Sequence, residues 1–545
     1  METLLRRLRC IGLLLIVPLI ALIGIRDLTE KKGPLWLSPN LDPSYVYFLN
    51  SLLILHGQPP AHIDHPGTPV QLIGAAVLRS KHPEPVKKIT LNALKNPESY
   101  LNEIHHTLRN MIVVALFAAG GLLAWKLNSI PAGILCQATP FLFVDSWMAA
   151  IRVTPETLFP FIAILYFAFL IVAGERKLAA KTTWPWALLA GLFAGLGVAN
   201  KLTFLPLLAF LPAIVPGLRN SLVSSGSFFL ALAASLFPIW QKLSVFWTWT
   251  AGLATHTGRH GFGETGIINP HTYGTNFVTT FADAAPLAPI VVLSVIVAVC
   301  CLRHNQTDLP ARERAWLLLK IVICQILGVA FVAKHPGRVY TTPLLFSASL
   351  NAWHVWVIVF KNLNFKWLRA ATAAFAVCVL VFAAWEFSVA QRVFAQRTQM
   401  ELADARRITD EAGGRPIIRY YSSSSPEYAL QLANKYSGTY FAGRLEATYP
   451  GSMCWDFFVG GFETVGNTAV PPPDLSKGPV YLTGTQPLEN YTVKHDSLVP
   501  EGTQLILLWE SRYDEPHHLM AQRPTYLYRL ELTAPKTPAP ATNPQ

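Results

Sequence analysis

Long apolar stretches separated by short polar ones run from the N-terminus to about residue 388. About eleven of them are long enough to cross a bilayer as a helix. They cover residues 10–27, 108–125, 129–146, 155–173, 184–200, 203–217, 221–241, 278–302, 315–333, 339–360 and 367–388. Because half-helices are too short to be detected as apolar stretches of spanning length, we expect about 11–13 transmembrane helices. The first is expected to stay uncleaved, since no clear signal-peptidase site follows it.

Basic residues in the short gaps predict the orientation of these helices. Arg6, Arg7 and Arg9 precede the first stretch, which places the N-terminus in the cytoplasm. Every second gap then faces the cytoplasm too, and each contains Lys or Arg: "KLNS", "GERKLAAKTT", "GLRNS", "RHNQTDLPARERA" and "KNLNFK". This count places the C-terminal part of the chain on the outer side.

After about residue 390 the pattern changes to that of a small α+β domain. "RPIIRYY", "PVYLTG", "TQLILLW" and "TYLYRLEL" have the composition of short strands, and "SPEYALQLANKY" that of a helix. We therefore expect a transmembrane domain over 1–390, an extramembrane α+β domain over 391–533 and a disordered, Pro-rich tail over 534–545.

The predicted outer loops contain nearly all the unusual polar clusters. The first, over 28–107, also has apolar residues at helical spacing around Tyr45 and Val70, which predicts two amphipathic helices in the membrane interface. "WTWTAGL" in a later loop predicts a third, with Trp247 and Trp249 at the level of the lipid head groups. Such helices favour a site that meets a lipid-borne substrate.

Composition narrows the functional classes. The chain is 52% hydrophobic and 14% charged, well below the charge of soluble proteins. Its net charge of +12 is scattered over short loops, which argues against a nucleic-acid partner and favours anionic lipids and phosphate-bearing substrates. The seven cysteines form no disulfide framework, and no Walker or G-x-G-x-x-G motif supports ATP-driven pumping.

Two acidic residues at the outer rim are candidate catalytic groups. Asp42 in "LDPSYVYF" and Glu156 in "RVTPETLF" each lie at the predicted start of a helix. Both have a plain structural interpretation, since Asp before Pro and "TPE" are good helix starts. An acid at the rim of an apolar bundle is also a candidate general base for an acceptor hydroxyl.

Cations on the same side form a second group of candidates, which would bind substrate. Lys or Arg in short outer loops opposes the positive-inside bias, so the presence of these residues there needs an explanation. One alternative is that their side chains snorkel to the interface; the other is a clamp on a phosphate leaving group. The group comprises Arg152, Lys201, Arg259, His260, Lys334, His335 and Arg338, with Tyr340 in the same "AKHPGRVYTTP" stretch.

The stretch "AHIDHPGTPVQ" admits two interpretations. His62, Asp64 and His65 have a spacing that would supply ligands to a divalent metal. Pro66 and Gly67 equally suit a tight turn that orients these side chains toward substrate or phosphate. We favour the turn, and no cofactor is required by it.

The chain resembles the GT-C superfamily of membrane glycosyltransferases that use polyprenyl-phosphate sugars. This group includes the protein O-mannosyltransferases and the aminoarabinose transferases of lipid A. "LDPSYVYFLNSLLILHGQPPAHIDHPGTPVQLIGA", "GLFAGLGVANKLTFLPLL" and "KHPGRVYTTPL" are similar to three stretches of that superfamily, although "HPG" stands where "PP" is commoner and "TPE" carries Glu rather than Asp. The resemblance implies Asp42 as general base, Glu156 as second acid, and Lys201 and Arg338 as ligands of the donor phosphate.

The resemblance also implies the reaction: transfer of a sugar, with inversion, from a polyprenyl-phosphate donor to a lipid or glycan acceptor. We expect it at the periplasmic face of a bacterial inner membrane, although the "NYT" sequon at Asn490 leaves an ER membrane open. Two alternatives are a transporter or flippase for a lipid-linked sugar and another lipid-phosphate group transferase. A transporter would place its charges at mid-span.

Overall fold

The computed structural model describes most of the chain. It covers residues 2–37, 44–64, 66–258, 261, 263–304, 308–363, 365–456, 459–488, 502–511 and 524–532, with the backbone alone for 2–9. The chain divides into two compact units. The first comprises Met1–Lys31, Asn50–Val86 and Ser99–Arg392, and the second comprises Lys32–Leu49, Lys87–Glu98 and Val393–Gln545. Each is described by itself.

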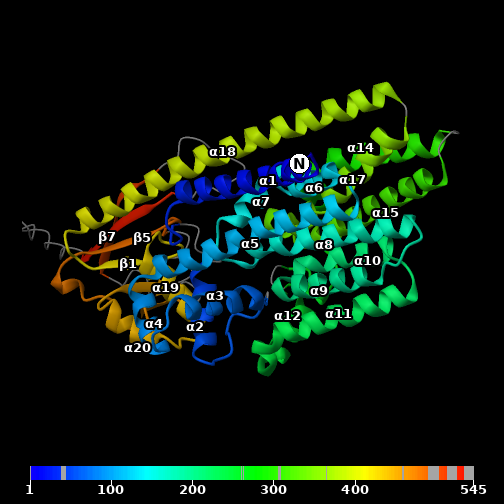
Figure 1. The fold of residues 1–545 in the computed structure, drawn as a ribbon. Helices are drawn as coiled ribbons and strands as arrows, with labels where there is room; N and C mark the ends of the chain where they lie inside the picture. The colour runs from blue at the N-terminus through cyan, green and yellow to red at the C-terminus, as the bar shows by residue number, and fades with distance from the viewer. Residues whose placement is uncertain are drawn as a thin grey trace, which may run out of the picture. The chain divides into compact units, whose positions relative to one another are not determined.

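The first unit is a bundle of helices that run beside one another (Figure 1). The α-helices wholly or partly in it are α1 (Glu2–Lys32), α2 (Ser44–Leu55), α3 (Thr68–Lys81), α5 (Pro97–Lys126), α6 (Ile130–Ala138), α7 (Val144–Ala150), α8 (Pro155–Leu178), α9 (Trp184–Asn200), α10 (Phe210–Ile214), α11 (Leu218–Leu236), α12 (Leu243–Thr255), α13 (Tyr273–Asp283), α14 (Leu287–Arg303), α15 (Leu309–Val332), α16 (Arg338–Leu345), α17 (Ala348–Val357) and α18 (Lys366–Ala412). Short helical turns join several of them: η1 (Thr139–Leu142), η2 (Leu202–Ala209), η3 (Phe237–Lys242) and η5 (Ile358–Asn362).

Among the described residues, seven helices are long and apolar enough to cross a membrane, or eight if the bent pair α13–α14 counts as one span. They indicate a multi-pass membrane protein. Each of the eleven apolar windows falls on an apolar helix, but three of these helices are shorter: Ile130–Leu142, Trp184–Asn200 and Leu202–Ile214. The predicted count of eleven or more full spans is therefore larger than helix lengths alone support. Hydropathy averages over a break such as the one before Phe210, so it does not detect it.

The buried α8 lies at the centre of this unit and packs against α9 and α7, while α9 packs against α11. The buried face of α8 includes nearly every residue from Pro155 to Gly174. Near its other end Glu175 accepts hydrogen bonds from Arg314 Nη2 at 2.8 Å and from Trp353 Nε1 at 2.6 Å. Both ends of α8 therefore carry a paired carboxylate, because Glu156 at the start is also in an ion pair.

The predicted interfacial helices are present, but one prediction about them is wrong. α2 is buried on every face, with Tyr45, Phe48 and Leu52 fully covered, rather than lying with one face in the head-group region. Its sequence has no charged residue, and its polar residues Ser44, Asn50 and Ser51 are buried too, which the spacing of its apolar residues alone did not reveal. The third, α12, leaves Trp247 exposed and continues the apolar segment Leu218–Thr255, which is long enough to cross a membrane, so its interfacial position stays a prediction.

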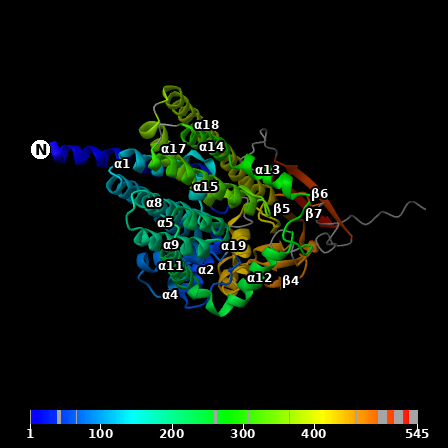
Figure 2. The same cartoon turned by 90° about the vertical axis from the view of Figure 1, so that its right-hand side faces the viewer.

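The described residues of the second unit form one mixed seven-stranded sheet in the order β4-β3-β2-β1-β5-β7-β6. Its strands are β1 (Ile417–Arg419), β2 (Met453–Asp456), β3 (Gly461–Thr464), β4 (Ala469–Val470), β5 (Val480–Gly484), β6 (Thr503–Glu510) and β7 (Tyr526–Leu532). β1 pairs in parallel with both β2 and β5, and the other pairings are antiparallel. Figure 2 shows β5, β7 and β6 side by side.

Helices α4 (Val86–Lys95), α19 (Pro426–Lys435), α20 (Ala442–Thr448) and the turn η6 (Leu475–Lys477) belong wholly or mainly to this unit, and the last part of α18 packs on the sheet through Ile408 and Ala412. The predictions of α19, β1, β5, β6 and β7 are confirmed, whereas β2, β3 and β4 were not predicted. The predicted disordered tail over 534–545 lies outside the described residues.

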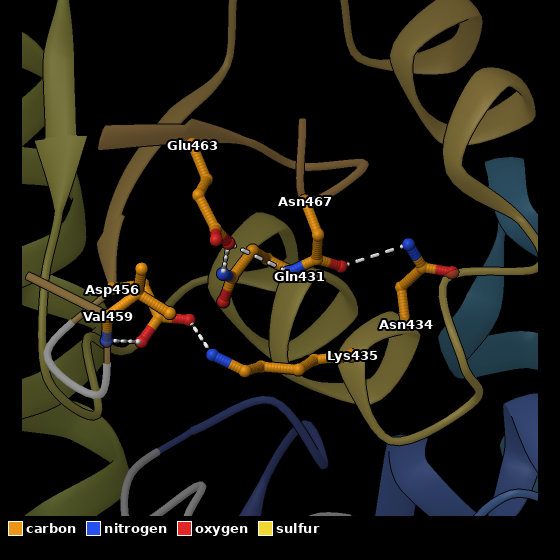
Figure 3. Close-up of polar contacts among 7 residues, drawn as sticks. All are labelled: Gln431, Asn434, Lys435, Asp456, Val459, Glu463 and Asn467. Carbon is orange, nitrogen blue, oxygen red and sulfur yellow. Dashed lines mark hydrogen bonds and ion pairs between the residues drawn. The ribbon is translucent and has the colours of Figure 1, made fainter. Parts of the chain in front are cut away.

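A polar network fastens α19 to the β2–β3 hairpin (Figure 3). Glu463 Oε2 accepts hydrogen bonds from Gln431 Nε2 at 2.9 Å and Asn467 Nδ2 at 3.1 Å. Asn434 Nδ2 donates to Asn467 Oδ1 at 2.9 Å, and Lys435 forms an ion pair with Asp456. Because these bonds engage successive turns of α19, they fix both the rotation and the position of the helix on the sheet.

Candidate functional site

The first element of the candidate site is the start of α8. Pro155 occupies the first turn, where its missing N–H costs nothing. Thr154 N donates to Thr157 Oγ1 at 3.3 Å, and Thr157 Oγ1 donates in turn to the carbonyl of Arg152 at 2.6 Å. This local network places Glu156, whose residue is only 4% exposed, at the positive end of a buried helix.

Lys201 is the partner of Glu156. It follows the last residue of α9 with an extended backbone, which ends the helix and directs the chain into η2. Lys201 Nζ forms an ion pair with Glu156 Oε1, and the lysine is only 3% exposed. The ammonium also lies 5.4 Å from the ring centroid of Tyr340. A buried charge pair is retained only where both charges have close partners, as here.

The "HPG" turn of the first loop lies against Lys201. Pro66 and Lys201 form an isolated antiparallel bridge, and Gly67 N donates to the carbonyl of Asn200 at 3.1 Å. Gly67 has φ 67°, a left-handed conformation that favours glycine. Asn200 Nδ2 donates to the carbonyl of Pro155 at 2.6 Å. Asn200 and Lys201, at the end of α9, thus join the loop turn to the start of α8.

Side chains upstream of this turn are also held in place. Asn50 Oδ1 accepts from the backbone N–H of Ala61 at 2.7 Å and of His62 at 3.1 Å. His62 Nδ1 lies 3.1 Å from Asp64 Oδ1. Gln71 Nε2 donates to the carbonyl of His62 at 3.1 Å. The described residues of this stretch are therefore held by hydrogen bonds from α2 and α3.

A second ion pair joins α7 and α16. Arg338, the first residue of α16, donates from Nε and Nη2 to Asp145 Oδ1 and Oδ2, each at 3.1 Å. This fork-to-fork geometry fixes the guanidinium more firmly than a single bond would. Because α16 packs against both α7 and α8 and carries Tyr340 two residues further on, the two ion pairs belong to neighbouring elements.

Other predicted residues are placed elsewhere or outside the description. Lys334 Nζ donates to the carbonyl of Ala254 at 2.7 Å, and His335 Nε2 lies 3.5 Å from the carbonyl of Leu253, so both meet the C-terminal end of α12. Partial burial lowers the pKa of the Lys334 ammonium. Arg152 lies in the turn between α7 and α8. Asp42, His65, Arg259 and His260 lie outside the described residues.

No metal site was found in the described part of the chain. There, no three His, Cys, Asp or Glu side chains come together as ligands for a metal ion. His65, one of the three residues proposed as ligands, is outside that part. The interactions of Glu156, Lys201, Asp145 and Arg338 are instead those of fixed, paired charges, which suit electrostatic stabilisation of a charged group.

Sequence reasoning overlooked Asp145 as a site residue and the bridging role of Asn200. Asp145 follows the apolar run "GILCQATPFLFV", so an acid at the end of an apolar stretch was available as a signal. No comparable signal marks Asn200, because its role depends on the carbonyl of Pro155, which is 45 residues away.

Comparison with known proteins adds no assignment. No model of a known protein family matches the chain, and no match was found among curated proteins or solved structures.

Proposed function

We propose that the protein is a GT-C-type membrane glycosyltransferase that moves a sugar from a polyprenyl-phosphate donor to a lipid or glycan hydroxyl. One observation carries the proposal. The turn of the first loop, Glu156, Lys201 and Tyr340 come from four separate parts of the sequence and meet at one buried place. Three of these parts are the stretches whose motifs resemble the GT-C superfamily.

In this proposal Asp42 is the general base that activates the acceptor hydroxyl. Lys201 and Arg338 stabilise the phosphate as it leaves with its negative charge. Each cation has a carboxylate partner in the donor-free protein, and that partner keeps it charged and positioned. Glu156 and Asp145 are accordingly positioning residues for the phosphate clamp, and inversion follows from a single displacement.

The proposed setting is the inner membrane of a bacterium, with the N-terminus in the cytoplasm and the second unit in the periplasm. This orientation is supported by the basic residues in every second short gap between apolar stretches. It places the first loop and the starts of α8 and α16 on the periplasmic side, where a polyprenyl-phosphate sugar would be presented.

The test in cells is mass spectrometry of lipid-linked and surface glycans in a strain that lacks the gene. Complementation with the wild type is expected to restore the missing glycan, and Asp42→Asn to reduce it by at least about 100-fold, the usual size of a lost acid–base group. Glu30→Gln, in an exposed helical ion pair, is the control. Full restoration by Asp42→Asn would show that Asp42 is not the general base.

A second test separates transfer from transport. The purified chain in nanodiscs has no compartments, so movement of a lipid-linked sugar across the membrane cannot be detected there, whereas transfer to an added acceptor can. Conversion of the polyprenyl-phosphate sugar to free polyprenyl phosphate supports the transferase. Flipping in liposomes without any such conversion would identify a transporter instead.

A further inference from the structure

In the sheet of the second unit, the chain leaves two neighbouring parallel strands, β1 and β5, in opposite directions. β1 lies between β2 and β5 and is parallel to both. After β1 the chain passes through α19 and α20 to β2, whereas after β5 it continues toward β6 and β7 on the other side. The carboxyl ends of such strands enclose a crevice, the usual ligand position in open α/β sheets.

A cavity of about 210 Å³ lies at this position. Its walls include Arg419 at the end of β1, Thr483 in β5, and Ser423–Ser425 leading into α19. The last part of α18 adds Glu401 and Asp404. All the lining residues belong to the second unit. The polar network of Figure 3 holds α19 on the sheet and thereby holds the start of that helix at the cavity wall.

Two polar atoms of this wall have no hydrogen-bond partner within the described part of the chain: Thr483 Oγ1 and Asp404 Oδ2, although the Asp404 carboxylate as a whole is also hydrogen-bonded to Ser511 and Thr525. Thr483 is only 3% exposed, so bulk water does not satisfy its hydroxyl. Leaving such a group unpaired costs free energy, and buried polar groups are normally bonded to protein, ordered water or ligand. A ligand that offers hydroxyl groups would satisfy both atoms.

The charged residues of the cavity wall indicate which class of ligand it can bind. Three carboxylates line the cavity, Glu401, Asp404 and Glu427, against one cation, Arg419. That guanidinium already pairs with Glu427, with Nη2 3.2 Å from Oε1, and Glu401 pairs with Arg397, which does not line the cavity. Asp404 is the carboxylate without an ion-pair partner among the described residues. The wall therefore disfavours phosphate and other anions. It is well supplied with acceptors for hydroxyl donors, because an ionised carboxylate only accepts hydrogen bonds and Ser and Thr hydroxyls both donate and accept.

We propose that this cavity binds a neutral monosaccharide unit of a glycan. Its hydroxyl groups would donate to Asp404 Oδ2 and exchange hydrogen bonds with Thr483 and the serines of 423–425. Trp36, which also lines the cavity, supplies an aromatic side chain for the apolar face of the sugar ring. The proposal does not rest on the transferase function, because binding at this cavity needs neither donor nor transfer.

Saturation-transfer-difference NMR on the full-length chain in detergent tests this proposal. The probes are the methyl glycosides of glucose, galactose, mannose and N-acetylglucosamine. At least one of them is expected to show saturation transfer, and Thr483→Val, which keeps the shape and removes the hydroxyl, is expected to weaken its binding about three- to tenfold, the effect of one hydrogen bond. Asp404→Asn is expected to weaken it by a similar or larger factor.

Thr448→Val is the matched control, since Thr448 lies on α20 and does not line the cavity. It is expected to leave binding unchanged. The proposal is overturned if no probe shows transfer to the wild type, or if binding is the same in Thr483→Val and Asp404→Asn as in the wild type. Tighter binding of glucose 1-phosphate than of methyl glucoside would also overturn it, because the cavity would then favour anions. Absence of glycan transfer by the wild type, with sugar binding intact, would refute only the proposed transferase function.

Discussion

The ion pair between Glu156 and Lys201 makes a quantitative prediction for a double-mutant cycle. Both residues are nearly inaccessible, at 4% and 3% exposed. Lys201→Met leaves a carboxylate buried without its cation, and Glu156→Gln leaves a buried ammonium without its anion. Breaking a buried pair in this way costs about 3–5 kcal/mol. We expect each single substitution to lower the free energy of unfolding by that amount.

The double variant Glu156→Gln/Lys201→Met tests whether the two residues are energetically coupled. It removes both charges and leaves neutral side chains of similar size, so we expect it to cost no more than either single substitution. The measurement is reversible unfolding by SDS in mixed micelles. The control cycle uses Arg26 and Glu30, whose side chains are 71% and 63% exposed, and should show no measurable coupling. If the effects at Glu156 and Lys201 simply add, the pair is not a buried, mutually dependent unit and our reasoning is wrong.

Two further predictions concern the neighbouring ion pair and the second unit. Arg338→Lys keeps the charge but loses the two-point contact with Asp145, so it should lower the free energy of unfolding by about 1–2 kcal/mol in the same titration; an unchanged value would contradict the bidentate geometry. Burial raises the pKa of the Cys454 thiol to about 12, so a variant that keeps only this cysteine should react with iodoacetamide at pH 8 far more slowly when folded than in SDS. Because the folded thiol resists deprotonation, the stability that it contributes is complete below the unfolded pKa of about 8.5 and is lost as pH rises toward 12. Equal labelling rates in the folded and SDS-unfolded states would contradict this burial.

The sequence predicted the helical class and the C-terminal sheet because each rests on a local pattern. The apolar windows coincide with helices, and the strand-like composition of "TQLILLW" and "TYLYRLEL" coincides with β6 and β7. The hairpin of β2 and β3 was missed because "MCWD" and "GFET" contain no run of β-branched or aromatic residues, unlike the paired Ile and Tyr residues of "RPIIRYY" around β1. In the same way, the number of spans was overestimated because hydropathy does not report where a helix breaks.

The candidate site was predictable as a set of residues but not as a set of pairs. Topology placed Glu156, Lys201 and Arg338 on one side of the membrane, and each was singled out because a charge near an apolar span is costly. Which acid pairs with which cation depends on how α8, α9, α7 and α16 pack. That packing is decided by contacts between residues far apart in sequence, for which a single sequence carries no signal.

The two carboxylates of α8 have a mechanical consequence for the bilayer. Glu156 and Glu175 are about 28 Å apart along the helix axis at 1.5 Å per residue, close to the hydrocarbon thickness of about 30 Å. Each is paired with a cation from another part of the bundle: Lys201, just after α9, at one end and Arg314 on α15 at the other. Because both ends of α8 are held by ion pairs, we expect the helix to resist sliding along its axis. For the same reason we expect it to resist tilting to match a thinner or thicker membrane.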